Sequence, residues 1–175
     1  MTHGGIIVKV TRLCNLRCSY CHDWRASGDI MSFRVLAHVI ASAMATFDSV
    51  QFIWHGGETT LVPISFYKKA MALQARYLRP GCTVRNDLQT NGTRIDDEWA
   101  EFFRENQFGV GVSLDGPREI HDRQRLDAGG KPSFDRVLGG LDTLRRHGIP
   151  SSILMVVDED TLALGPDREI GRAHV

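Results

Sequence analysis

The sequence predicts an α/β fold in which about five parallel strands alternate with four helices. Short apolar or β-branched runs alternate with longer segments whose apolar residues recur at helical spacing. A length of 175 residues suffices for one domain with a sizeable core. Apolar residues make up 42% of the chain and charged residues 24%, which argues against a disordered chain.

The predicted strands are the short apolar runs. The first, from Ile6 to Val10, is β-branched and typical of a buried strand. Segment 83–88 is a weaker candidate because polar residues interrupt it. Gly109 and Gly111 in the fourth run suggest a close approach of the backbone to another group. The five predicted strands cover residues 6–10, 50–54, 83–88, 108–114 and 152–157.

Four segments between these strands carry apolar residues at helical spacing. Ser32, Pro63, Asp96 and Ser133 suit the N-terminal positions of these four helices. Gly148 suits the end of the fourth helix. Such alternation favours a parallel sheet covered by helices. Ligands of these folds gather where the strands end.

Polar and reactive residues follow four of the predicted strands. Since the carboxyl ends of parallel strands share one rim, four such loops indicate a site more strongly than any one motif. The loops are Cys14 to Cys21, His55 to Glu58, Gln89 to Thr93 and Ser113 to Pro117.

Three cysteines lie close together in the first loop. Cys14, Cys18 and Cys21 have the spacing C-x3-C-x2-C. Three thiolates can hold three corners of a four-iron cubane and leave one iron open to a small molecule. The alternative is a structural zinc site with His22 as fourth ligand, in a binding module that is not an enzyme. No second ligand pair lies at the spacing of a zinc finger.

The stretch CNLRCSYC over residues 14–21 resembles the signature of radical S-adenosylmethionine (SAM) enzymes. This resemblance implies a partial (β/α)6 radical SAM barrel, truncated here to about five strands and four helices. It implies that Cys14, Cys18 and Cys21 ligate a 4Fe-4S cluster. It further implies that SAM chelates the fourth iron and that Tyr20 packs near the adenine.

Two further loops are similar to motifs of the same family. Gly56, Gly57 and Glu58 match the GGE motif, which binds the SAM amine in that family, and Asn91 lies in a Thr-Asn-Gly that faces the cavity. Taken alone, each motif is more often an ordinary turn. The resemblance therefore implies cofactor contacts at these four residues.

The loop after the fourth predicted strand resembles a narrower group. Ser113-Leu114-Asp115-Gly116-Pro117, followed by the charged run 121–125, is similar to the SPASM-type subfamily that modifies peptides and proteins. This subfamily includes anaerobic sulfatase maturases and ribosomal-peptide maturases. By this resemblance Ser113 and Arg125 contact SAM, and the guanidinium suits the methionine carboxylate. Asp115 is expected to be structural or close to substrate.

The family implies an enzyme that cleaves SAM reductively to a 5′-deoxyadenosyl radical, which abstracts hydrogen from a peptide or protein. Ribosomal-peptide or protein maturation is the expected function, and formylglycine formation in sulfatases stays an alternative. The expected electron donor is flavodoxin- or ferredoxin-like. The sequence identifies no catalytic base.

Charge and hydropathy narrow the expected partners and compartment. Lys plus Arg and Asp plus Glu each total 21, and this balance gives nucleic acid no support. No apolar run approaches the roughly 20 residues of a membrane span. Few cysteines, three of them in one loop, suit a reducing compartment, and we expect a cytoplasmic protein.

The end of the chain is unusual. Residues 1–168 are expected to be an incomplete radical SAM core. Segment 169–175 reads as a translated sequencing adapter, so the gene is expected to continue past Arg168. The last predicted strand would then have an unpaired edge and no helix after it. We expect the 175-residue chain by itself to be poorly soluble or inactive.

Overall fold

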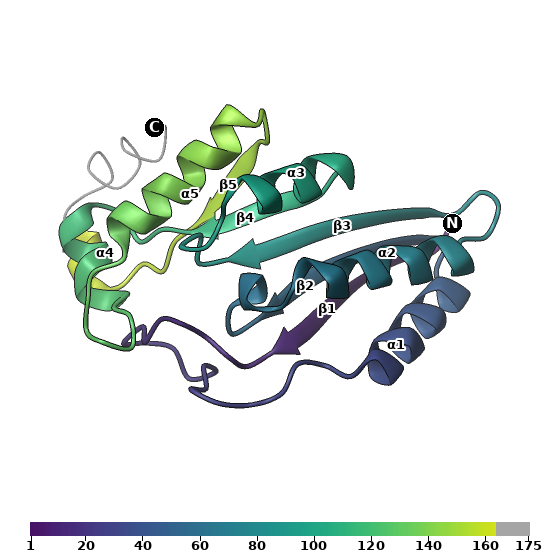
Figure 1. Ribbon diagram of the computed structural model, residues 1–175, viewed down its shortest axis with the longest axis horizontal. Helices are drawn as coiled ribbons and strands as arrows, with labels where there is room; N and C mark the ends of the chain where they lie inside the picture. The colour runs from purple at the N-terminus through teal and green to yellow at the C-terminus, as the bar shows by residue number, and fades with distance from the viewer. Residues whose placement is uncertain (164–175) are drawn as a thin grey trace.

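A computed structural model describes residues 1–163, in which five parallel strands form a sheet with helices packed against it (Figure 1). The order along the sheet follows the chain, and every neighbouring pair is parallel. The predicted α/β class and the five strands are confirmed. The end of the predicted core at Arg168 and the adapter-like segment 169–175 lie outside the described residues. The strands are β1 (His3–Thr11), β2 (Ser49–Gly56), β3 (Thr83–Thr90), β4 (Gly109–Ser113) and β5 (Ser151–Leu154).

Four longer helices correspond to the predicted ones, but the predicted number of helices is too low. The longer helices are α1 (Phe33–Thr46), α2 (Ile64–Tyr77), α3 (Asp97–Glu105) and α5 (Phe134–Arg146). Three short ones join them: η1 (Thr59–Leu61), α4 (Arg118–Gln124) and α6 (Glu159–Ala163). The sequence did not predict α4 because charged residues interrupt its apolar pattern. This helix buries Ile120, His121 and Gln124. A short helix therefore does follow β5, contrary to the expectation.

Most helix starts follow the sequence prediction. Ser32 Oγ accepts from the Val35 amide at 3.3 Å, and an Asp96 oxygen accepts from Trp99 N at 3.0 Å. At α5 the predicted start is right, but the Ser133 side chain does not accept from the helix amides. Asp122 Oδ1, from α4, accepts both Ser133 N at 3.1 Å and Phe134 N at 2.9 Å. The Ser133 side chain is thereby left for another partner.

The core lies between the sheet and its helices, with Trp54 fully buried near its centre. Asn86 on β3 also faces this side. Its Oδ1 accepts from Trp54 Nε1 and from Gln74 Nε2, both at 2.9 Å. Because the buried amide is satisfied in this way, β3 tolerates a polar residue that weakened its prediction. No helix within residues 1–163 has the length and apolar character needed to cross a membrane.

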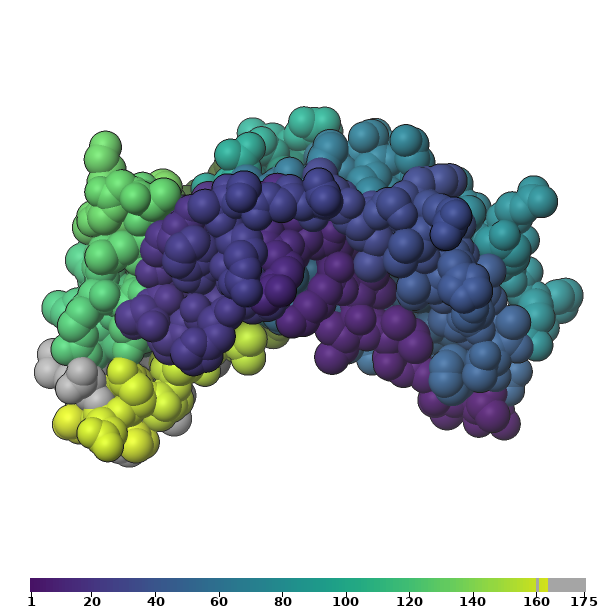
Figure 2. Space-filling model, turned by 90° about the horizontal axis from the view of Figure 1, so that it is seen from below, coloured from purple at the N-terminus to yellow at the C-terminus, as the bar shows by residue number. Residues whose placement is uncertain are grey.

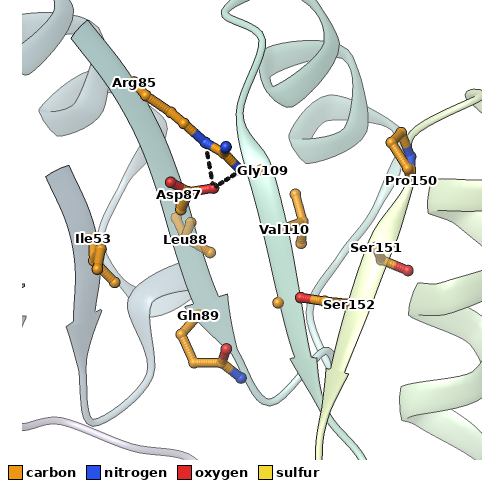
Figure 3. A pocket seen from close by; sticks show the side chains of 11 residues that line it. Ile53, Arg85, Asp87, Leu88, Gln89, Gly109, Val110, Pro150, Ser151 and Ser152 are labelled. Carbon is orange, nitrogen blue, oxygen red and sulfur yellow. Dashed lines mark hydrogen bonds and ion pairs between the residues drawn. The ribbon is translucent and has the colours of Figure 1, made fainter. Parts of the chain in front are cut away.

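The opposite face of the sheet is hollow. Figure 2 shows the molecule as an arch, hollowed on its lower side. A cavity of about 420 Å³ lies on this face over β3, β4 and β5 (Figure 3). Asp87 Oδ1 pairs with Arg85 Nη2 at 2.9 Å there. A Cβ at Gly109 or Gly111 would collide with the side chains of Asp87 or Gln89, so side chains rather than backbone make the predicted close approach.

Candidate active site

The loops after β1, β2 and β3 meet at one rim of the sheet, as their parallel order predicts. Gly57 N donates to Thr11 O at 2.8 Å, and Glu58 N donates to Leu13 O at 2.7 Å. These two hydrogen bonds hold the loop after β2 against the start of the cysteine loop. Asn91, just after β3, and Asp115, after β4, also form hydrogen bonds with residues of the cysteine loop. The four rim loops therefore form one continuous site.

The three cysteine thiols are free and half-buried. Burial, the largest cause, raises the pKa of Cys14 to about 11 and also raises the pKa of Cys18. Leu16 N donates to Cys14 Sγ at 3.4 Å. Half-buried thiols that accept hydrogen bonds from N–H groups are suitable ligands for a metal cluster. The positive charge of the metal stabilises the thiolate form of these cysteines. The donor set therefore fits the expected 4Fe-4S cluster.

The zinc alternative has less support from the geometry. No three His, Cys, Asp or Glu side chains among residues 1–163 lie close enough to hold a single metal ion. His22, the expected fourth zinc ligand, is exposed. A four-iron cluster is larger than one ion, so it does not require its thiols to converge on one point.

Glu58 is a buried carboxylate at the centre of the rim, with an exposed fraction of 1%. Its Oε1 accepts from Thr60 N at 2.9 Å, Thr60 Oγ1 at 2.7 Å and Thr90 Oγ1 at 2.6 Å. Its Oε2 accepts from Asn91 N at 2.7 Å. Within the described part of the chain, no ion pair involves this carboxylate. A buried carboxylate without a cation can be balanced by a cationic ligand such as an ammonium group.

The two glycines of the GGE motif face the protein chain. A Cβ at Gly57 would stand 2.6 Å from Arg12 O and would also collide with Leu13 O. A Cβ at Gly56 would collide with Thr11 O, and the φ of Gly56 is 137°, which favours glycine. The two glycines therefore allow the loop after β2 to lie against the backbone of Thr11, Arg12 and Leu13, at the end of β1 and just before the cysteine loop.

Asn91 connects Glu58 to the cysteine loop. Its backbone amide binds Glu58, while its Nδ2 donates to Asn15 Oδ1 at 2.8 Å and to Cys14 Sγ at 3.9 Å. Asn15 in turn donates to Thr93 Oγ1 at 2.9 Å. The side-chain amide of Asn91 thus lies against the first cysteine of the loop.

Asp115 lies at the other side of the cysteine loop and is fully buried. Its Oδ2 accepts from Tyr20 OH at 2.6 Å and from Arg125 Nε at 2.6 Å. Arg125 Nη1 lies 4.0 Å from Cys18 Sγ. Burial raises the pKa of Tyr20, so its hydroxyl stays protonated and donates. The structure therefore gives Asp115 a central place that the sequence did not reveal.

Ser113 is placed apart from Arg125. It ends β4 on the hollow face, and its Oγ accepts from Gln89 Nε2 at 3.0 Å. Among residues 1–163, no hydrogen bond joins the Ser113 side chain to the cysteine loop. Its hydrogen-bond partner Gln89 lines the cavity of Figure 3.

Comparison with protein families gives one match. The family model described as the radical SAM superfamily matches residues 8–163. Among curated relatives, the serine-type anaerobic sulfatase-maturating enzyme of Bacteroides thetaiotaomicron is 45% identical over 164 residues, covering 88% of this chain and 39% of that protein. The cysteine-type enzyme of Clostridium novyi is 40% identical, covering 85% and 42%. The chain thus spans about 40% of the length of these relatives.

Solved structures match the fold over nearly the whole chain. Native anSMEcpe with bound AdoMet has a TM-score of 0.87 at 34% identity, covering 95% of this chain and 47% of that one. The same protein with AdoMet and the Kp18Cys peptide has a TM-score of 0.88 at 34% identity, covering 94% and 46%. Streptococcus suis SuiB, at 15% identity and a TM-score of 0.66, shares the fold alone, with coverage of 89% and 33%.

Proposed function

The chain belongs to the radical SAM superfamily, a family of enzymes whose cofactors are a 4Fe-4S cluster and SAM, and on this premise we propose that it carries the cofactor site of a peptide or protein maturase. When bound, these cofactors supply a 5′-deoxyadenosyl radical that abstracts hydrogen from the substrate. The observation that carries the proposal is the meeting of Asn91 and Arg125 on two sides of one cysteine loop, at Cys14 and at Cys18.

We assign the cluster to Cys14, Cys18 and Cys21. The proposed role of Glu58 is to balance the ammonium group of SAM, because this buried carboxylate has no cation among residues 1–163. Tyr20 is the proposed aromatic contact of the adenine. These roles support cofactor binding from both ends of the cysteine loop.

The remaining cofactor contacts are proposed on the β4 side of the rim and around the GGE loop. Arg125 has one guanidinium nitrogen outside its pair with Asp115, and this Nη1 suits the methionine carboxylate. We place Ser113 among the cofactor contacts because it ends β4 at the same rim. Gly56 and Gly57 act by keeping the loop after β2 tight against the cysteine loop.

The substrate is proposed to be a peptide segment bound at the hollow face, directly below the rim. Support comes from the cavity beside Gln89, whose side chain reaches from this face to Ser113 at the rim. Relatives at 33–45% identity are named sulfatase-maturating enzymes. This favours sulfatase maturation over ribosomal-peptide maturation as the function of the protein that contains this chain.

Two further expectations belong to the proposal. An external flavodoxin- or ferredoxin-like protein is proposed to supply the electron, because reductive cleavage of SAM requires a reduced cluster. The protein works in the reducing cytoplasm, which suits four free thiols.

The test is anaerobic reconstitution of a polypeptide that contains this chain, followed by incubation with SAM, a reductant and a sulfatase peptide bearing serine or cysteine. We expect about four irons per chain, release of methionine and 5′-deoxyadenosine, and loss of two hydrogens from a serine peptide. Replacing Cys18 by Ala abolishes all three, whereas Cys82→Ala, a half-buried thiol outside the loop, leaves them intact. Zinc in place of iron, or intact SAM after reduction, refutes the proposal.

A further inference from the structure

We infer that Asp115 is a positioning residue that holds the guanidinium of Arg125 beside Cys18 and so sets the charge next to the cluster. The inference rests on the proposed assignment of Cys18 to that cluster. It concerns the buried ion pair of Asp115 and Arg125, which meets Cys18 from a distant part of the sequence.

The ion pair is bidentate and almost completely buried. Arg125 Nε donates to Asp115 Oδ2 at 2.6 Å, and Nη2 donates to Oδ1 at 3.2 Å. The exposed fractions of the two side chains are 8% for Arg125 and 0% for Asp115. Because a guanidinium is planar and rigid, two hydrogen bonds on one edge fix the direction of the remaining nitrogen. That nitrogen, Nη1, donates to Cys18 Sγ at 4.0 Å.

The same carboxylate also fixes the cysteine loop. Tyr20, between Cys18 and Cys21 in the sequence, donates its hydroxyl to Asp115 Oδ2 at 2.6 Å. The Arg125 Cζ atom lies 5.5 Å from the centre of the Tyr20 ring, within the range of a cation–π contact. Asp115 thus keeps the guanidinium and the loop together as one unit.

A closed circuit of hydrogen bonds holds the pair in place. Asp115 N donates to His121 Nδ1 at 3.3 Å, and His121 Nε2 lies 3.0 Å from Ser133 Oγ. Ser133 Oγ then donates to the backbone oxygen of Arg125 at 2.5 Å. This role explains why Ser133 does not cap α5. Val156 N adds a 3.0 Å bond to Asp115 Oδ1 from the segment after β5.

The charges of this pair act on Cys18 in opposite directions. The positive Nη1 lies 4.0 Å from the sulfur, and Asp115 binds the other two guanidinium nitrogens from farther away. Positive charge near a cluster thiolate stabilises the reduced, more negative cluster and raises its reduction potential. Asp115 offsets part of that effect while it fixes the geometry. Removing either charge therefore shifts the potential, with opposite signs.

The test measures the reduction potential of the cluster, by redox titration with electron paramagnetic resonance, in a reconstituted polypeptide containing this chain. Asp115→Asn keeps one oxygen that can hold Arg125 but removes the negative charge, and we expect the potential to rise by roughly 59 mV, a tenfold change in the ratio of reduced to oxidised cluster. Arg125→Gln removes the positive charge and lowers the potential. The double variant returns toward the wild-type value.

The matched control is Asp135→Asn, which breaks an exposed pair with Arg118 and leaves the potential unchanged. An unchanged potential in Asp115→Asn with full iron content overturns the inference, as do shifts of the same sign in both single variants. Loss of iron from Asp115→Asn but not from Arg125→Gln also overturns it, since Asp115 would then act independently of Arg125. A wild-type protein that assembles no cluster refutes the proposed function itself.

Discussion

The backbone amide of Asn91 donates a 2.7 Å hydrogen bond to Oε2 of Glu58, so a buried carboxylate joins the end of β3 to the loop after β2. The other oxygen of this carboxylate binds Thr60 and Thr90. One side chain therefore aligns two rim loops before any ligand is bound.

Replacing Glu58 by Gln destabilises the protein. The new amide presents N–H groups to a site where every partner is a donor, so at least one buried donor loses its acceptor. We expect a loss of about 1–3 kcal/mol in the free energy of unfolding, measured in urea. Glu101→Gln, at an exposed position on α3, changes it by less than about 0.5 kcal/mol. Equal values for the two variants contradict the organising role of Glu58.

Replacing Gly57 by Ala forces the rim apart. The added Cβ meets the backbone oxygens of Arg12 and Leu13, which cannot move without shifting the cysteine loop. We expect the free energy of unfolding to fall by about 1–3 kcal/mol, which is the usual effect of overpacking. Gly139→Ala in α5 has open space around its Cβ, and we expect it to stabilise by about 0.5–1 kcal/mol. Thermal unfolding tests this: the melting temperature should fall in Gly57→Ala and rise in Gly139→Ala. Changes of the same sign in both variants would contradict the prediction.

His121 makes stability depend on pH. Burial, followed by the nearby positive charge of Arg125, lowers the pKa of His121 to about 4 from an ordinary value of 6.5. Between these two pH values His121 is protonated in the unfolded chain and neutral in the folded chain. The free energy of unfolding therefore decreases as the pH falls from about 6.5 to about 4. The free energy of unfolding is then lower by about 3 kcal/mol.

The His121 effect is isolated by comparing variants. In His121→Gln this part of the pH dependence disappears, while His38→Gln, at an exposed site on α1, retains it. Chemical unfolding at a series of pH values gives both curves. Parallel curves for wild type and His121→Gln would mean that His121 is protonated in the folded state as readily as in the unfolded state.

Asp122 caps α5 from outside that helix. Its Oδ1 accepts from the amides of Ser133 and Phe134, so Asp122→Ala leaves two N–H groups without this acceptor. We expect a loss of about 1 kcal/mol in the free energy of unfolding. Asp142→Ala, within α5, removes only exposed pairs with Arg145 and Arg146 and has a smaller effect. A larger effect at Asp142 would contradict this assignment of the cap.

The sequence by itself determined the sheet, the four longer helices and the position of the cysteine loop. Apolar periodicity is local, and a parallel order brings the ends of successive strands to one rim. Short motifs such as CNLRCSYC are local as well. For these reasons the contacts of Cys14 and Cys18 with residues from later loops agree with the expected rim.

The tertiary structure alone decided which side chains meet there. Tyr20 and Asp115 are 95 positions apart, and nothing in their local sequence pairs them. Arg125, just after α4, is buried because Asp115 neutralises its charge, and the Ser133 side chain donates to Arg125 O instead of capping α5. Burial depends on what packs above a residue, and hydrogen bonds depend on atoms brought close by folding. Periodicity along the chain contains neither kind of information.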